Sequence, residues 1–115
     1  MSPSIVDLLK HILDEARFIY NEKSTLSEEQ FMVDEKTKRA FVRSLEIIGE
    51  ASKNIPIEFK ERYKDVEWKE MARMRDRLIH HYFGVDYCIV WNIAEENIPI
   101  LIKQIANIIK ELDTK

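Results

Sequence analysis

Apolar residues recur at intervals of three and four along most of this chain, the spacing that places side chains on one face of an α-helix. The first stripe follows Ser4, which forms a capping-box pattern with Asp7, and it predicts a helix that runs to about Tyr20. Ser27 and Gln30 repeat the capping pattern and predict a short helical turn. The polar residues between these two segments are typical of a loop.

A long helix is predicted from Asp34, a candidate N-cap, to Ile55, because the residue before Pro56 is displaced from the α region. Gly49 lies inside this helix, where glycine costs roughly 1 kcal/mol relative to alanine, and such a glycine usually permits the close approach of another helix. Pro56 is then expected to begin a short helix that ends at Arg62. The core-facing stripe of the long helix consists of Phe41, Leu45, Ile48, Ser52 and Ile55.

Two further helices complete the predicted fold. Asp65 is expected to cap the first, which Gly84 ends, and Asp86 is expected to cap the second. Pro99 lies inside the final apolar stripe and should kink that helix or divide it in two. Four main helices joined by short loops favour an all-α fold, an antiparallel up-and-down bundle whose final helix is kinked at Pro99. The final stripe consists of Trp91, Ala94, Ile98, Leu101, Ile105, Ile108 and Leu112.

The composition agrees with a single helical domain over residues 1–115. Apolar residues make up 45% of the chain, enough for a hydrophobic core, and only two glycines and three prolines argue against a turn-rich β protein. The one cysteine, Cys88, cannot form an intrachain disulfide, and no Cys/His cluster suggests a metal site. No secretory signal and no uncharged apolar stretch of about 20 residues is found, so we expect a cytoplasmic protein without membrane contact.

The charge balance limits how this chain could bind nucleic acid. Its formal net charge is −3, whereas a dedicated nucleic-acid-binding domain usually carries a basic footprint. Any contact with RNA must therefore come from a local patch or from the combined surface of a dimer. Residues 69–77 form such a patch, with four basic residues against two acidic ones.

The most specific chemistry lies in the run Arg-Asp-Arg-Leu-Ile-His-His-Tyr at residues 75–82. Arg75 offers a planar fork of donors that suits a phosphate. The imidazole of His80 suits proton transfer near neutral pH, and the hydroxyl of Tyr82 can be modified. Together, the three side chains predict chemistry on a phosphodiester or a nucleotide.

Helix geometry separates the two groups that such chemistry needs. At about 100° per residue, Arg75 and His80 lie about 140° apart, whereas Arg75 and Tyr82 lie about 20° apart. Arg75 and His80 converge only if the last turn loosens, if the arginine side chain swings round, or if a second subunit completes the site. The alternative is structural: a solvated or ion-paired arginine, with a histidine and a tyrosine that cap helix carbonyls.

Several residues give this run a family context. Arg75, Asp76 and His80 fit a signature of arginine, polar residue and histidine, and Tyr82 adds a tyrosine two positions after the histidine. On these residues the chain resembles the HEPN superfamily and, within it, the HepT-like toxin branch. His81 places a second imidazole beside the signature one, but the spacing favours His80. The resemblance extends over roughly residues 5–110. Its other landmarks are Ile48, Gly49, Glu50, Ala51, Trp68, Phe83, Asp86, Trp91 and Pro99.

The resemblance implies a fold, an activity and a partner. HEPN domains are four- to five-helix bundles that form homodimers, many are metal-independent ribonucleases, and their arginine and histidine meet in a cleft at the dimer interface. HepT-like proteins are toxins paired with MntA, a small nucleotidyltransferase antitoxin that can transfer AMP to the toxin's tyrosine. By this resemblance Arg75 would bind the scissile phosphate of RNA, and His80 would act as general base or acid on the ribose 2′-hydroxyl. Tyr82 would accept AMP, and no cofactor is implied.

Two acidic residues are expected to support this site. Glu50 is expected to pair with Arg75 or Arg77, while Asp76 either orients a neighbouring arginine or histidine or is a solvated surface residue. The resulting hypothesis is an endoribonuclease toxin that adenylylation of Tyr82 silences. The alternative is a non-catalytic helical binding module that serves as the modification substrate of a nucleotidyltransferase.

Overall fold

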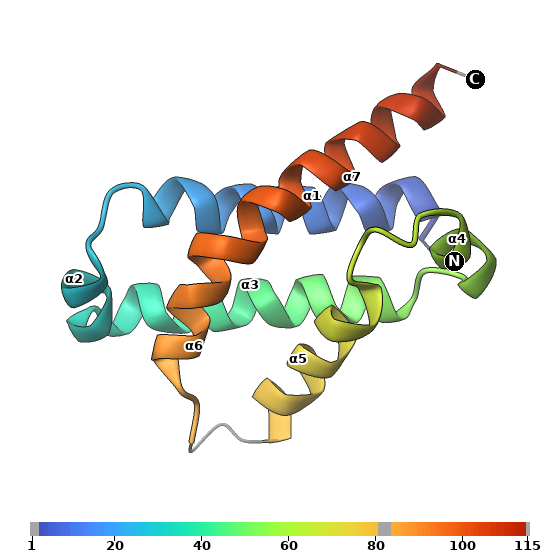
Figure 1. Ribbon diagram of the computed structural model, residues 1–115. Coiled ribbons are helices and arrows are strands. Elements are labelled where there is room, and N and C mark those ends of the chain that lie inside the picture. Colours follow the sequence, from blue (N-terminus) through green and yellow to red (C-terminus); the bar gives the residue numbers. More distant parts are fainter. Residues whose placement is uncertain (1–2, 81–83, 115) are drawn as a thin grey trace.

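Helices account for all the regular secondary structure in residues 3–80 and 84–114, the part of the chain that this computed structural model describes (Figure 1). The predicted all-α fold is confirmed. No helix within those residues is both long enough and apolar enough to span a bilayer. The elements are α1 (Ile5–Lys23), α2 (Glu28–Val33), α3 (Glu35–Lys53), α4 (Ile57–Arg62), α5 (Trp68–His80), α6 (Tyr87–Asn92), the π-helical segment η1 (Ile93–Asn97) and α7 (Ile98–Asp113).

The first helices begin where short polar side chains can satisfy their free N–H groups. Ser4 and Ser27 form the expected capping boxes at the starts of α1 and α2. The carboxylate of Asp34 accepts a backbone N–H at 3.0 Å at the start of α3. Helix α1 continues to Lys23, about a turn beyond its expected end, and the hydroxyl of Ser24 donates to a carbonyl of that last turn at 2.7 Å.

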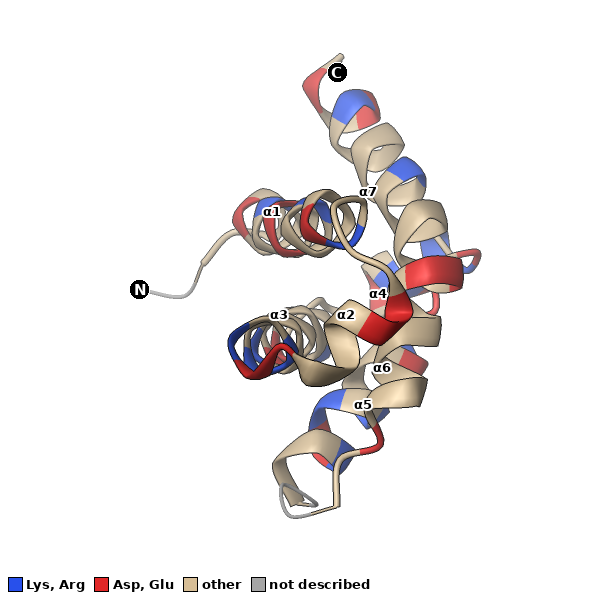
Figure 2. Cartoon of the chain, turned by 90° about the vertical axis from the view of Figure 1, so that its left-hand side faces the viewer, with Lys and Arg blue, Asp and Glu red and all other residues tan. Residues whose placement is uncertain are grey.

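Two long antiparallel helices, α1 and α3, form one layer, and Figure 2 shows the later helices on one side of it. The segment from α6 to α7 crosses α1 obliquely, and α5 packs on α3. Aromatic side chains join the short helix α2 to α3 on one side and to α6 on the other. Phe31 of α2 lies 5.0 Å from Phe41 of α3 and 5.2 Å from Trp91 of α6, measured between ring centroids.

Pro99 interrupts the final helix, as the sequence predicts. Proline lacks an N–H, and its ring crowds the carbonyl four residues earlier, so a regular α-helix cannot pass through it unchanged. The structure places Pro99 in the first turn of α7 and a π-helical turn, η1, directly before it. The N–H of Ile98 donates to the carbonyl of Ile93, five residues back. The interruption is therefore a wider turn within one continuous helical segment.

The expected N-cap of α5 at Asp65 is wrong. Helix α5 begins at Trp68, and the carbonyl oxygen of Asp65 instead accepts Nε2 of Gln104 from α7 at 2.9 Å. Trp68 is buried, and its indole N–H donates to the carbonyl of Tyr63 at 3.0 Å. Burial of this large side chain decides where α5 starts, because it outweighs a capping preference of about 1 kcal/mol.

Gly49 is the point of closest approach between α3 and α5, which confirms the reason expected for a glycine inside a helix. A Cβ at this position would overlap the Cβ of Arg75 and would lie 2.6 Å from the carbonyl oxygen of Met71. Both neighbours belong to α5, and the carbonyl is part of its backbone, so α5 would have to move. The missing side chain therefore sets the spacing of the two helices at Arg75.

We expect Gly49→Ala to destabilise the fold by about 1–3 kcal/mol, because the added methyl group forces α3 and α5 apart and outweighs a gain in helix propensity of roughly 1 kcal/mol. Urea unfolding followed by circular dichroism measures the change. Gly84→Ala is the matched control, since no atom of the described residues beyond its chain neighbours lies within 4 Å of the Cβ that it adds. The control should change the free energy of unfolding by less than about 1 kcal/mol. A Gly49→Ala protein as stable as its parent would contradict the close contact.

Candidate functional site

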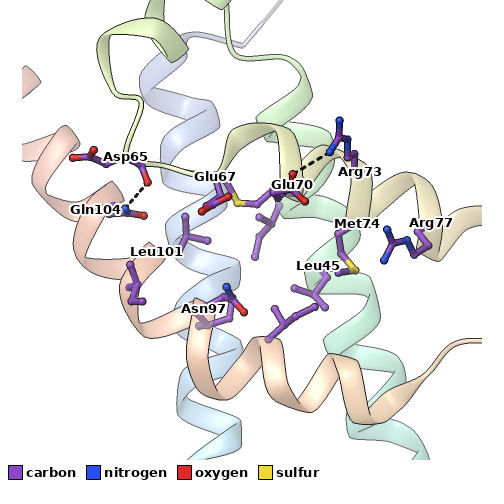
Figure 3. A pocket seen from close by; sticks show the side chains of 15 residues that line it. Leu45, Asp65, Glu67, Glu70, Arg73, Met74, Arg77, Asn97, Leu101 and Gln104 are labelled. Carbon is purple, nitrogen blue, oxygen red and sulfur yellow. Dashed lines mark hydrogen bonds and ion pairs between the residues drawn. The ribbon is translucent and has the colours of Figure 1, made fainter.

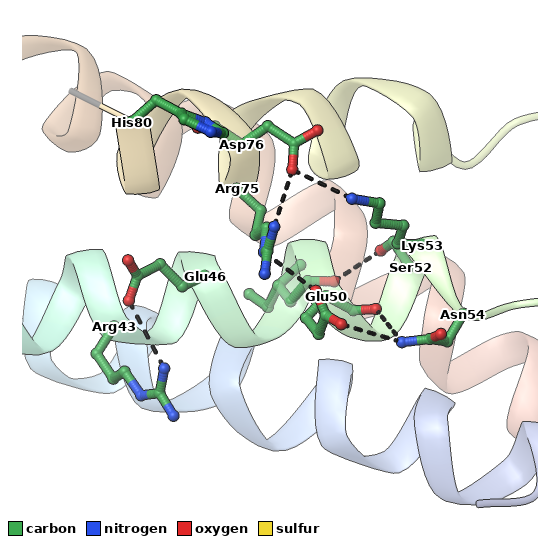
Figure 4. Close-up of polar contacts among 10 residues, drawn as sticks. Arg43, Glu46, Glu50, Ser52, Lys53, Asn54, Arg75, Asp76 and His80 are labelled. Carbon is green, nitrogen blue, oxygen red and sulfur yellow. Dashed lines mark hydrogen bonds and ion pairs between the residues drawn. The ribbon is translucent and has the colours of Figure 1, made fainter. Parts of the chain in front are cut away.

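Arg75 is held by two carboxylates, one from each of the helices that meet at Gly49 (Figure 4). Its Nε lies 3.0 Å from Oε2 of Glu50 on α3, which confirms the expected ion pair. Its Nη1 lies 3.0 Å from Oδ1 of Asp76, the next residue on α5. These contacts fix the plane of the guanidinium and leave Nη2 as the nitrogen that they do not use. The side chain is 26% exposed, so solvent reaches it.

The carboxylate of Asp76 accepts hydrogen bonds from two cationic side chains. Its Oδ1 lies 3.0 Å from Nη1 of Arg75 and 3.4 Å from Nζ of Lys53, at the end of α3. The hydrogen bond from Arg75, followed by the hydrogen bond from Lys53, holds the pKa of this carboxyl below its ordinary value. Asp76 therefore orients the neighbouring arginine, one of the two roles expected for it.

Lys53 is a member of this cluster that the sequence reasoning missed. It lies three positions after Glu50 and so shares a face of α3 with it, a spacing that could have marked it. Its link to the site depends on how α3 packs against α5, which the spacing of residues does not give. The two helices are thus joined by two polar contacts, Glu50 to Arg75 and Lys53 to Asp76.

His80 makes a hydrogen bond that selects one form of its neutral ring. Its Nδ1 lies 2.7 Å from the backbone carbonyl oxygen of Asp76, one turn earlier in α5. A carbonyl oxygen can only accept, so Nδ1 carries the proton, and in the neutral ring Nε2 is then left with a free lone pair. The side chain is exposed. His80 can therefore take a proton from a ligand at Nε2.

Arg75 and His80 do not meet within one chain. Figure 4 shows the arginine directed from α5 toward Glu50 on α3, while His80 lies along α5 itself. Two of the three arrangements that could bring Arg75 and His80 together do not occur in this structure. The arginine is fixed by Glu50 and does not swing round, and α5 stays α-helical through His80 instead of loosening.

A hollow of about 300 Å³ opens beside the Arg75 guanidinium between α1, α3 and α5. Glu50 forms part of its wall, together with His11 of α1 and Arg43 of α3. Nη1 of Arg43 lies 3.7 Å from Oε1 of Glu46 on the same helix, and the arginine side chain is well exposed (Figure 4). The hollow gives a phosphate access to the guanidinium from solvent.

Two of the expected site residues, His81 and Tyr82, lie outside the described residues. Across residues 3–80 and 84–114, no group of three or more histidine, cysteine, aspartate and glutamate side chains is placed to hold a metal ion. What the geometry offers is a fixed guanidinium and an imidazole with a free Nε2. These groups can bind an anion and move a proton.

The match to a known family covers nearly all of these elements. Residues 6–108 match the family model described as Ribonuclease HepT-like. The chain belongs to the HepT-like ribonuclease family of the HEPN superfamily. The matched residues include Glu50, Arg75 and His80, and they run from α1 into α7.

Relatives of this HepT-like chain align with it over most of their length. A candidate RNase of Caldanaerobacter subterraneus subsp. tengcongensis is 52% identical over 103 residues, which cover 90% of this chain and 92% of that protein. A candidate RNase of Methanocaldococcus jannaschii is 46% identical, with 91% of this chain and 87% of that protein covered. A protein of Thermococcus cleftensis named as a probable ribonuclease HepT is 48% identical, and the alignment covers 88% of this chain and 92% of that protein. No solved structure matches the chain.

The ion pairs of Asp76 predict how the stability of this HepT-like chain depends on pH. Because the pKa of Asp76 is lowered on folding from its ordinary value of 3.8, its contribution is complete above about pH 4 and is lost as the pH falls through the lowered pKa. The parent should be more stable than Asp76→Asn at pH 7, and this difference should shrink below about pH 4. Urea unfolding of both proteins from pH 7 to pH 3 measures it. A difference that stays constant over this range would contradict the predicted linkage.

Proposed function

We propose that this HepT-like chain is a metal-independent endoribonuclease that acts as a homodimer. The observation that carries the proposal is the hydrogen bond from His80 Nδ1 to a backbone carbonyl, because it leaves Nε2 free to act as a base. A base alone does not cleave RNA, since negative charge builds on the phosphate during attack. Arg75, fixed beside an open hollow, supplies the cation for that charge.

The proposed reaction uses the ribose 2′-hydroxyl as the nucleophile. Nε2 of His80 removes the proton from this hydroxyl, and the 2′-oxygen then attacks the adjacent phosphorus. The guanidinium of Arg75 donates through Nη2 to the phosphate oxygen on which charge increases. The bond to the leaving 5′-oxygen breaks, and that oxygen takes up a proton from solvent. The products are a 2′,3′-cyclic phosphate and a free 5′-hydroxyl.

A second copy of the chain would bring the two groups together. Within one chain Arg75 is directed to α3 and His80 lies along α5, so the two side chains are not directed toward one another. A two-fold axis near α5 would place Arg75 of one protomer opposite His80 of its partner. We therefore propose that each cleavage site takes its arginine and its histidine from different protomers.

Mixing two inactive variants tests both the activity and the shared site. Arg75→Ala and His80→Ala should each lose RNA cleavage while they keep the parent's circular dichroism spectrum. If the variants are unfolded and refolded together, half of the dimers are mixed and each mixed dimer keeps one intact site, so about a quarter of the parent activity should return. Cleavage of a fluorescent RNA, with EDTA present to remove metal ions, measures this recovery.

Arg17→Ala, an exposed position on α1, is the matched loss of one positive charge and should cut RNA as the parent does. Activity of a folded His80→Ala protein equal to the parent's would refute the ribonuclease proposal. Absence of recovery in the mixture would refute the shared site alone. Loss of all parent activity in EDTA would refute independence from metal ions.

We further propose that this ribonuclease is the toxin of a pair with a small MntA-like nucleotidyltransferase. The partner would transfer AMP from ATP to the hydroxyl of Tyr82, with release of pyrophosphate. An AMP phosphate at this position would bring negative charge to the part of α5 that carries Arg75 and would compete with RNA for the guanidinium.

Intact mass spectrometry after incubation with an MntA-like nucleotidyltransferase and ATP tests this modification. The parent should gain AMP and lose RNA cleavage, and Tyr82→Phe should do neither. AMP that is still added to Tyr82→Phe would contradict the assignment. AMP added at Tyr82 of a parent that never cuts RNA would favour the alternative, a non-catalytic module that the partner modifies.

A further inference from the structure

Arg77 lies within one helical turn of His80 on α5 and on nearly the same side of the helix. At about 100° per residue the two are about 60° apart, and residues three positions apart have Cβ atoms about 5–6 Å from each other. Arg75 lies on the other side of α5 and is held by Glu50. Arg77 is exposed and takes part in none of the ion pairs between described residues. Its charge is therefore available to a ligand on the face that carries His80.

Arg77 also lines a groove of about 380 Å³ between α5 and the final helical segment (Figure 3). Helix α5 packs on α3 but makes no extensive contact with α7 in the part of the chain that is described, which leaves the groove between them. Its volume is within the range of small-molecule pockets, and thioethers pack well against aromatic rings. A flat aromatic ligand suits such a groove. Its apolar floor includes Leu45, Met71, Met74 and Leu101.

The charge on the rim of the groove changes from negative to positive along α5. In Figure 3 the guanidinium of Arg77 is directed toward the groove, while the carboxylates of Glu67 and Glu70 lie nearer the start of the helix. Glu70 is paired with Arg73 at 3.1 Å, whereas Glu67 has no ion pair among the described residues. Residues 67 and 77 are ten positions apart, about 15 Å along the axis between their backbones. Because helical side chains lean toward the start of the helix, the long side chain of Arg77 brings its guanidinium nearer to Glu67, toward the span from the phosphate of a nucleotide to the far edge of its base.

We propose that this groove binds one nucleotide of the RNA strand, next to the ribose whose 2′-hydroxyl gives its proton to His80. The phosphate lies on Arg77, the base lies over Met71 and Met74, and an exocyclic amino group of the base donates to the carboxylate of Glu67. The inference rests on the proposed function for the identity of the ligand as RNA. Carboxylates accept hydrogen bonds from the amino group of cytosine, whereas uracil presents a carbonyl oxygen there. The groove therefore prefers cytosine to uracil.

Binding of CMP and UMP to the full-length chain tests this assignment, because neither nucleotide is a substrate for cleavage. With carbon-13 labels on the methionine methyl groups, Met71 and Met74 report on the groove by NMR. Met32 of α2 does not line the groove and is the internal reference. We expect CMP to shift the signals of Met71 and Met74, to leave that of Met32 in place, and to bind about tenfold more tightly than UMP.

Two exposed variants separate the phosphate contact from the base contact. Arg77→Gln should weaken the binding of both nucleotides about tenfold, and Glu67→Gln should remove the preference for CMP. Arg17→Gln on α1 and Glu29→Gln on α2 make the same charge changes away from the groove and should bind as the parent does. The inference is overturned if neither methyl signal shifts, if CMP and UMP bind equally to the parent, or if Arg77→Gln binds as tightly as the parent.

This result is separable from the test of the ribonuclease. A chain that binds CMP in the groove with the expected preference but cuts no RNA would refute the proposed cleavage and keep the nucleotide site. A chain that cuts RNA while neither Met71 nor Met74 responds to CMP would refute the nucleotide site and keep the cleavage.

Discussion

The close contact between α3 and α5 at Gly49 determines where the guanidinium of the candidate site lies. Without a side chain at this position, the carbonyl of Met71 and the Cβ of Arg75 can pack directly on α3. Glu50, the next residue, then reaches Arg75 at 3.0 Å. A wider helix spacing would lengthen this ion pair, and such hydrogen bonds weaken steeply with distance and misalignment. One glycine and the acidic residue beside it therefore set both the spacing of two helices and the direction of one side chain.

The charges around this contact balance one another. Arg75 and Lys53 are matched by the carboxylates of Glu50 and Asp76, so the network is neutral before any ligand arrives. A side chain that is already fixed loses little conformational entropy when it binds a phosphate, which favours precise positioning. The same carboxylates repel an incoming anion. Tight binding of RNA therefore requires further contacts outside the network, supplied by other cations or by the bases.

Local rules predicted the parts of the molecule that depend on neighbours in sequence. The cap at Ser4 and the interruption before Pro99 involve atoms within five positions of each other, and both occur where the sequence places them. The start of α5 was missed because it depends on the burial of Trp68 in the core. The candidate site divides in the same way. Residue type and spacing marked Arg75 and its ion pair with Glu50, whereas Lys53 joins the site only through the packing of α3 on α5. The groove beside α5 likewise depends on where α7 crosses, which no local pattern reports.

The π-helical turn before Pro99 accommodates one extra residue in the final helical segment. Such a turn holds one residue more than an α-helical turn, so every side chain after it is rotated by about 100° from its place in an uninterrupted helix. Trp91 before the turn and Ile98 and Leu101 after it all face the interior with this offset in place. Removing one residue between positions 93 and 97 would restore a regular helix and leave the buried face of α7 directed as it is, because the loss of one residue cancels the offset. Homologous sequences that share this packing can therefore lose one residue at this turn, whereas the loss of one residue within α7 would rotate the buried side chains after it by about 100°.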